Sequence, residues 1–84
     1  MINNLVELAS CYRDNSTEQH IKHTGVVLIF NNQVYGWKNS LRDAHCEQPG
    51  SIAVDLNDNC YEAQGGDDYN GAKAWVYLKE NDSE

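Results

Sequence analysis

The sequence predicts an α+β domain in which an N-terminal helix packs on a five-stranded, mainly antiparallel sheet. Apolar residues recur at helical spacing near the N-terminus, short β-branched and aromatic segments follow from residue 26 onward, and turn-forming residues separate these segments. A chain of 84 residues has room for one hydrophobic core. We therefore expect one domain over 1–84, with a helical segment at 1–14, the sheet at 25–78 and a frayed, charged tail at 79–84.

The helix is expected from about residue 4 to residue 13. One helical face is apolar and carries Leu5, Leu8, Ala9 and Tyr12. Asn4 is placed to cap the helix, and Glu7 three residues later resembles a capping box. Residues 15–24 are polar, and two alternatives stay open for them: a loop, or a second short helical turn that begins at Ser16 or Thr17.

The first strand is expected at Val26–Phe30, where every residue is apolar. Such a run is typical of a strand buried on both faces, so we place it centrally in the sheet. Asn31 and Asn32 predict a two-residue hairpin turn, because asparagine tolerates left-handed conformations. The return strand covers 33–37, and Asn39 is expected to cap a short helical turn through residues 40–43.

The third strand is expected at 51–56, after the turn signal of Pro49-Gly50. Ile52, Val54 and Leu56 alternate with polar or small residues, so they share one face, while Asp55 points to the other. This alternation predicts a strand with one face in water.

A second hairpin and a fifth strand complete the predicted sheet. Residues 57–59 form a turn into a strand at 60–64, in which Tyr61 and Ala63 share a face. Residues 65–71 form a loop, and the fifth strand covers 74–78.

The charge of the chain argues for a protein partner and against nucleic acid. Thirteen acidic residues and six basic residues give a net charge of −7, whereas phosphate-backbone binding needs Lys and Arg. Residues 1–42 hold four basic and three acidic groups, and residues 43–84 hold two basic and ten acidic groups, net −8. This acidic half could attract a basic protein surface, or it could serve solubility alone.

No apolar run approaches the roughly 18 residues that cross a bilayer, and the N-terminus lacks signal-peptide features. We therefore expect a cytoplasmic protein without membrane contact. Cys11, Cys46 and Cys60 are an odd number in such a chain, which favours reduced thiols over disulfides. Cys11 and Cys60 are expected to pack as small apolar residues.

The sequence offers metal-ligand and nucleophile residue types, but not in a productive pattern. His20, His23, His45 and Cys46 are residues that zinc accepts, yet they lack the two close ligand pairs of structural zinc sites. His45, Cys46 and Glu47 are sequence neighbours, whereas a nucleophile and its base converge from separate segments. We predict no metal, no cofactor, no catalytic residue and no enzymatic activity.

The loop at 65–71 lacks the patterns of phosphate-binding and calcium-binding loops. Its glycines suit tight turns and its Asp and Asn residues suit local backbone bonds, while its tip displays residues to a partner. Arg42 is expected to clamp this loop through forked hydrogen bonds to Asp67 or Asp68. The candidate partner-binding residues are Trp37, Arg42, Asp43, Asp67, Asp68, Tyr69 and Asn70.

One short helix cannot cover a five-stranded sheet, so some strand aromatics are expected to face outward. They would form a partner's platform or a self-association surface, and a homodimer is one possible outcome. The aromatic residues concerned are Tyr35, Trp37, Tyr61, Trp75 and Tyr77.

About half of the chain carries a recognisable combination of short motifs. They are Val34-Tyr35-Gly36-Trp37-Lys38, Leu41-Arg42-Asp43, Pro49-Gly50, Ile52-Ala53-Val54-Asp55, and Gly65 to Ala72 ahead of Trp75. This combination resembles the antirestriction protein ArdR family, which travels on plasmids and other mobile elements. The resemblance implies help to incoming DNA against host restriction, and it brings no catalytic residues.

Two functional hypotheses follow. In the first, the chain is an antirestriction accessory that binds a host protein, with carboxylates placed where DNA phosphates would sit. In the second, it is a small-ligand-binding or regulatory module of unknown function.

Overall fold

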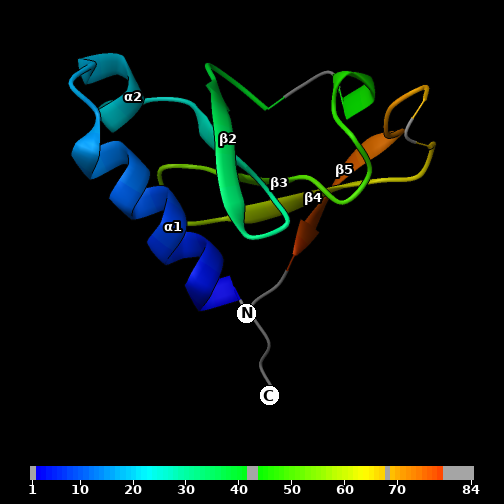
Figure 1. Cartoon of the computed structure of the whole chain (residues 1–84), viewed down its shortest axis with the longest axis horizontal. Helices are drawn as coiled ribbons and strands as arrows, with labels where there is room; N and C mark the ends of the chain where they lie inside the picture. Colours follow the sequence, from blue (N-terminus) through cyan, green and yellow to red (C-terminus); the bar gives the residue numbers. More distant parts are fainter. Residues whose placement is uncertain (1, 42–43, 68, 79–84) are drawn as a thin grey trace.

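A computed structural model describes residues 2–41, 44–67 and 69–78. These residues form an N-terminal helix α1 (Ile2–Asn15), a short helix α2 (Gln19–His23), a 3₁₀ turn η1 (Ala44–Cys46) and a five-stranded antiparallel sheet (Figure 1). The strands are β1 (Val26–Phe30), β2 (Gln33–Lys38), β3 (Ile52–Val54), β4 (Cys60–Gln64) and β5 (Ala74–Leu78). Their order across the sheet is β2-β1-β3-β4-β5, and every neighbouring pair is antiparallel. The predicted α+β fold is confirmed.

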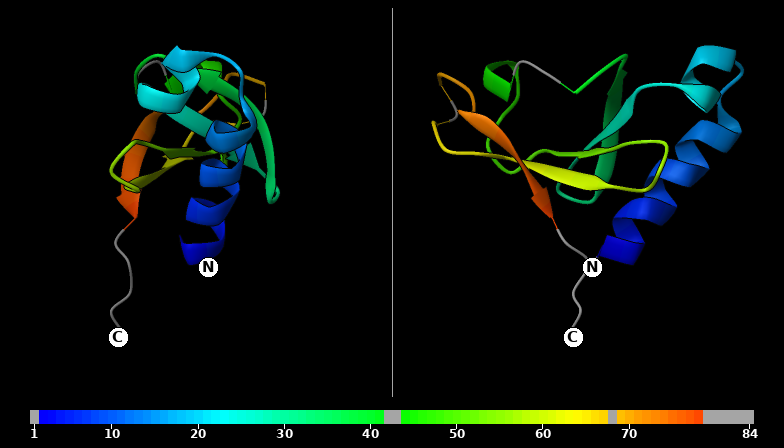
Figure 2. Two further views of the ribbon diagram at one scale, coloured as in Figure 1. Left: turned by 90° about the vertical axis from the view of Figure 1, so that its left-hand side faces the viewer. Right: turned by 180° about the vertical axis from the view of Figure 1, so that it is seen from behind.

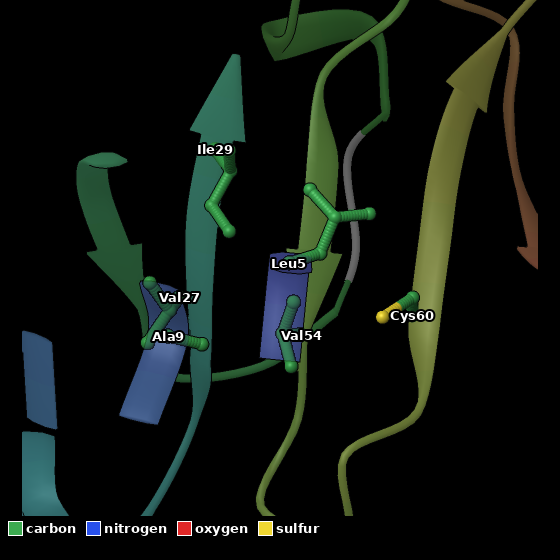
Figure 3. Packing of buried hydrophobic residues seen from close by; sticks show 6 residues of the cluster. All are labelled: Leu5, Ala9, Val27, Ile29, Val54 and Cys60. Atoms are coloured by element: carbon green, nitrogen blue, oxygen red, sulfur yellow. The ribbon is translucent and has the colours of Figure 1, made fainter. Parts of the chain in front are cut away.

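Helix α1 packs its apolar face on the sheet as predicted. Leu5 and Ala9 are buried against β1, β3 and β4, where they meet a cluster of Val27, Ile29, Val54 and Cys60 (Figure 3). The helix begins at Ile2, so Asn4 lies inside it, and the capping role predicted for Asn4 is wrong. Asparagine weakens a helix interior only slightly, and burial of the Leu5–Ala9 face outweighs that cost.

Of the two alternatives for residues 15–24, the structure contains the short helix, although it begins at Gln19 rather than at Ser16 or Thr17. Arg13 fixes its position. The Arg13 guanidinium donates hydrogen bonds to the carbonyls of Ile21 (2.6 Å), Thr24 (2.8 Å) and Gly25 (2.8 Å), and at 3.4 Å to that of Val54. Arg13 is 8% exposed, and burial lowers its pKa. A buried arginine thus ties α1 to α2, to the start of β1 and to the end of β3.

The β1–β2 hairpin has the predicted two-residue turn. Asn31 and Asn32 both have positive φ, 54° and 63°, the combination that suits a tight hairpin. The register shifts between Leu28 and Ile29, which leaves Tyr35 as an extra residue in β2 and forms a β-bulge. β1 is buried as predicted and lies inside the sheet, but the middle position belongs to β3.

The third strand differs from the prediction. It covers only Ile52–Val54, and Ala53 and Val54 are both fully buried although their side chains point to opposite faces. Because Ala53 lies on the face that was expected to be wet, its burial shows that this prediction is wrong, and Leu56, expected on the buried face, is exposed beyond the strand end. The reason is the position of β3 in the sheet: α1 covers one face, and Leu41 and Trp75 pack with Ala53 on the other.

The second sheet face is covered by chain segments rather than by a long helix. Ala44 of η1 is buried with Ala63 and Ala72, and Trp75 packs against this cluster. β5 forms the edge of the sheet away from α1, as two views in Figure 2 show.

Some predictions fall outside the described residues. Of the helical turn expected at 40–43, Ser40 and Leu41 lie in a bend, whereas Arg42 and Asp43 lie outside the described residues, as does the tail at 79–84. Among the helices of the described residues, none is long and apolar enough to cross a membrane. Cys60 is buried as expected, whereas Cys11 is exposed, so its predicted role as a packed apolar residue is wrong.

Candidate functional site

Glu47 directly follows η1 and is a buried carboxylate with two side-chain partners. Tyr35 Oη donates a hydrogen bond to Glu47 Oε1 at 2.5 Å, and Lys38 Nζ lies 2.7 Å from Glu47 Oε2. The Glu47 side chain is 8% exposed and that of Lys38 27%. Because Tyr35 and Lys38 belong to β2, this contact holds the 44–51 segment on the second face of the sheet.

Burial and the contact with Glu47 change the pKa of the Tyr35 hydroxyl. Burial of the hydroxyl end and its hydrogen bond to Glu47 raise the pKa of Tyr35 to about 12, although Ser51 acts in the opposite direction. An ionised Tyr35 would face the Glu47 carboxylate without a proton between them. Tyr35 therefore acts here as a hydrogen-bond donor and not as a base.

A hollow of about 460 Å³ lies beside this cluster. The end of the β1–β2 hairpin forms one wall and the segment after η1 forms the other. Its lining residues are Phe30, Asn31, Gln33, Val34, Tyr35, Cys46, Glu47, Gln48 and Ser51. The hollow is open to solvent, and its lining combines apolar surface with amide and carboxylate groups.

The loop at 65–71 is built on Asp67. Asp67 Oδ1 accepts hydrogen bonds from the backbone N–H groups of Tyr69 (3.0 Å) and Asn70 (2.7 Å), and the backbones of Asp67 and Gly71 form a bridge. These bonds, that from Asn70 first, lower the pKa of Asp67. The expected local use of Asp and Asn is confirmed, and Asp67 shapes the loop instead of offering a free carboxylate.

Two glycines fix how this loop lies on η1. Gly66 and Gly71 have φ of 71° and 84°, and a Cβ atom at Gly71 would lie 1.9 Å from the carbonyl oxygen of His45. The loop backbone therefore packs directly on the 3₁₀ turn. Tyr69 projects from the tip with 93% of its surface exposed, so its aromatic ring is displayed to solvent.

Strands β4 and β5 carry a pair of tyrosines on the face opposite α1. Tyr61 and Tyr77 are directly opposite each other in the ladder, and their rings are 5.5 Å apart in a tilted arrangement. Tyr77 is 50% exposed. Burial, followed by the nearby Asp55 and Tyr77, raises the pKa of Tyr61. The two rings together present an aromatic surface.

Four carboxylates lie along the chain between the turn that precedes β4 and the loop that follows it. We call this set the acidic band; it consists of Asp55, Asp58, Glu62 and Asp67. Within residues 55–67 and 69–78, Lys73 is the only Lys or Arg. Asp55 is used locally, since its Oδ1 accepts from the N–H groups of Asn57 and Asn59, each at 2.9 Å. Asp58 and Glu62 are the members least engaged with the backbone.

The structure does not bring Trp37 and the 65–71 loop together. Trp37 lies on β2, at the opposite sheet edge from the β4–β5 loop. Its Nε1–H donates to the carbonyl of Thr24 at 2.9 Å, and its ring makes an edge contact with His20 at 4.9 Å. Trp37 thus packs α2 against the sheet. Arg42, Asp43 and Asp68 lie outside the described residues, and so does the predicted clamp from Arg42 to the loop.

Arg13 and Glu47 are the two residues that sequence reasoning did not single out as structural groups. Both are charged types, which are usually exposed. For Arg13 the available signal is its place one residue after Tyr12, at the edge of the apolar helix face. For Glu47 the sequence carries no comparable signal, because its partners lie nine or more positions away.

Metal-ligand residues do not gather in the described part of the chain. No group of three or more His, Cys, Asp and Glu residues there is placed to hold a metal ion. Cys46 is exposed beside the hollow, and Cys11 is exposed on α1.

Comparisons of the chain with protein-family models, with curated proteins and with solved structures give no match.

Proposed function

We propose that the chain is a small acidic protein-interaction module that binds a basic surface of a host protein through β4, β5 and their flanking loops. The observation that carries this proposal is that the acidic band and the exposed tyrosines Tyr69 and Tyr77 belong to the same two strands and their flanking loops, with Glu62 on one sheet face and Tyr77 on the other.

The charge distribution supports a basic partner. Asp58 and Glu62 belong to a stretch of chain, 55–67 and 69–78, that carries four carboxylates and one lysine, and Arg13 of α1 interacts electrostatically with Asp55 and Asp58. Like charges near one another raise the free energy of the unbound protein, and a cationic surface relieves this repulsion. Such complementarity speeds association and rejects acidic partners, including nucleic acid.

The aromatic residues support a protein as partner. Tyrosine is enriched at protein interfaces because it offers a large, rigid contact surface and a polar end at a small entropic cost. Tyr69 stands at a loop tip. The hydrogen bonds to Asp67 and the close packing at Gly66 and Gly71 fix the loop backbone, which reduces the conformational entropy that the loop loses on binding.

The family resemblance supports a biological role for this module. Its Tyr-Gly-Trp, Leu-Arg-Asp and glycine-aspartate motifs resemble the antirestriction protein ArdR family of mobile elements. A chain of this kind would occupy the DNA-binding surface of a host restriction component, with Asp58 and Glu62 in the place of phosphates. It would act by binding in the cytoplasm and would catalyse no reaction.

The test is the establishment of unmodified plasmid DNA in a restricting bacterial host. Wild-type protein is expected to raise the ratio of unmodified to modified transformants, and Tyr69→Ala combined with Tyr77→Ala to lower it again. Both tyrosines are exposed, so this variant should keep the fold, which circular dichroism checks. An unchanged ratio with wild-type protein would remove the antirestriction assignment.

A second candidate function rests on the 460 Å³ hollow next to Glu47. There the chain would bind a small molecule that contacts the amides of Gln33 and Gln48. Titration of ¹⁵N-labelled protein with a library of small metabolites should then shift the signals of these residues. A library that shifts signals only elsewhere would reject this candidate.

A further inference from the structure

The two edges of the sheet are protected to different degrees. Edge strand β2 contains a β-bulge at Tyr35 and a charged residue, Lys38, both of which hinder pairing with another strand. Edge strand β5 pairs with β4 over five consecutive residues without a register shift, and residues 74–78 include no charged residue and no proline. Val76 and Tyr77 are exposed. β5 is therefore the edge suited to accept a further strand.

The backbone directions of β4 and β5 follow from neighbouring hydrogen bonds. Ala63 donates its N–H to Ser51 at 2.9 Å and accepts at 2.8 Å from Gly50, so both its backbone groups point toward β3. These directions alternate along an antiparallel strand, and the carbonyl of Gln64 accordingly accepts from Lys73 on the β5 side, at 2.9 Å. Glu62 faces β5 by the same alternation along β4, and Val76 is its partner in the ladder, so the backbone of Val76 faces β4 whereas the N–H and C=O of Tyr77 face the outer edge.

The side chains on the two faces of this edge differ in character. Val76 pairs with Glu62, so a strand added beside Val76 would have Glu62 one strand further across the same face. Val76 is small enough for a long cationic side chain to reach over it to that carboxylate. On the opposite face, Tyr77 and Tyr61 offer an aromatic surface to apolar residues of the added strand.

We infer that β5 binds an extended segment of a partner protein by strand addition, and that this segment alternates basic and apolar residues. The basic residues lie on the Glu62 side and the apolar residues on the Tyr77 side. This inference rests on the proposed function and specifies its mode of binding. Main-chain hydrogen bonds from Tyr77 hold the segment, and the two faces select its residue types.

Charge favours this occupant over a second copy of the chain. Two copies joined at β5 would bring two acidic bands together, each within a chain of net charge −7. The six residues after β5 in the sequence, 79–84, add three acidic residues and one basic residue. A basic segment meets opposite charge on this edge, whereas a second copy meets like charge.

The test uses two eight-residue peptides of equal charge, one alternating Lys and Val and the other alternating Lys and Pro. Only the Lys-Val peptide can form a strand ladder, because proline lacks the N–H donor. In ¹⁵N-labelled protein, the outward N–H of Tyr77 should exchange about tenfold more slowly when the Lys-Val peptide occupies about nine-tenths of the sites. The N–H of Ala63, already bonded to β3, serves as the unchanged internal reference.

Two variants distinguish the contribution of the Tyr77 backbone N–H to peptide binding from that of the Tyr77 side chain. Tyr77→Pro removes the outward N–H and leaves the bonds to β4 in place, as proline allows on an edge strand. Tyr77→Ala removes the same side chain but keeps the N–H. Loss of Lys-Val binding in the proline variant alone would support strand addition.

Equal binding of both peptides, without slower exchange at Tyr77, would overturn strand addition and leave charge-driven partner binding standing. Absence of binding by either peptide would also overturn strand addition, while the plasmid assay judges the proposed function independently.

Discussion

Replacing Glu47 by alanine should remove a large part of the free energy of unfolding of this domain. The side chain is 8% exposed, and the change leaves the hydroxyl of Tyr35 and the ammonium group of Lys38 without their acceptor. Removal of one partner from a buried ion pair costs about 3–5 kcal/mol. Because Lys38 keeps 27% exposure and can regain water, we expect the lower end, about 3 kcal/mol. Small domains have only about 5–15 kcal/mol in total.

Urea unfolding followed by the fluorescence of Trp37 and Trp75 measures this loss. Glu47→Gln keeps an acceptor for Tyr35 but loses the charge, so about 1.5–2 kcal/mol should be lost. The matched control is Glu18→Gln, since the Glu18 side chain is 62% exposed and meets only His20, at 3.8 Å. It should change stability by less than about 0.5 kcal/mol. A Glu47→Ala protein as stable as the Glu18→Gln control would refute the reasoning.

The remaining predictions concern four other positions or sets of positions. Arg13→Ala leaves the carbonyls of Ile21 and Gly25 without the Arg13 donor, whereas the carbonyl of Thr24 keeps its bond from Trp37, and the change should cost about 3 kcal/mol in urea unfolding. A loss below about 1 kcal/mol would contradict the structural role of Arg13. Since the pKa of Tyr35 is raised from 10.0 to about 12, its contribution to stability is complete below pH 10 and lost as the pH rises toward 12. Tyr35→Phe should lack that component of the alkaline loss, and parallel curves for the two proteins would disprove it. Gly71→Ala should cost more than about 2 kcal/mol, because its Cβ would meet the His45 carbonyl at a positive φ, whereas Gly36→Ala, with its nearest contact at 3.9 Å, serves as the tolerated control. In the native protein a thiol reagent should label Cys11 and Cys46 rapidly and Cys60 only on unfolding; rapid labelling of all three would contradict the buried position of Cys60.

The sequence predicted those parts of the fold that local patterns determine. The apolar spacing around Leu5 and Ala9 sufficed for α1, and Asn31-Asn32 sufficed for the first hairpin, because helix faces and tight turns are set by nearby residues. The wet face of β3 was predicted wrongly, since burial of Ala53 depends on Leu41 and Trp75, which come from distant segments.

The candidate site was predicted only in part. Tyr69 at an exposed loop tip and the local role of Asp67 follow from turn chemistry. Trp37 and this loop were both predicted to bind the partner, but the strand order places them at opposite edges. The contact of Glu47 with Tyr35 and Lys38 could not be predicted, because a charged residue becomes buried only when the fold brings its partners to it.

The central claim is that the acidic band binds a basic host protein, and paired charge variants test it most directly. Asp58→Asn with Glu62→Gln removes two carboxylates from the band, and asparagine suits the φ of 65° at position 58. Asp14→Asn with Glu18→Gln removes two exposed carboxylates near α1 and α2 and leaves the same net charge.

The measurement is the ratio of unmodified to modified plasmid transformants in a restricting host that expresses each variant at equal level. We expect the band variant to lose about fivefold or more of the protection that the wild-type protein gives, while the α1–α2 variant retains it. Equal protection by the two variants would contradict the claim that this surface binds the partner.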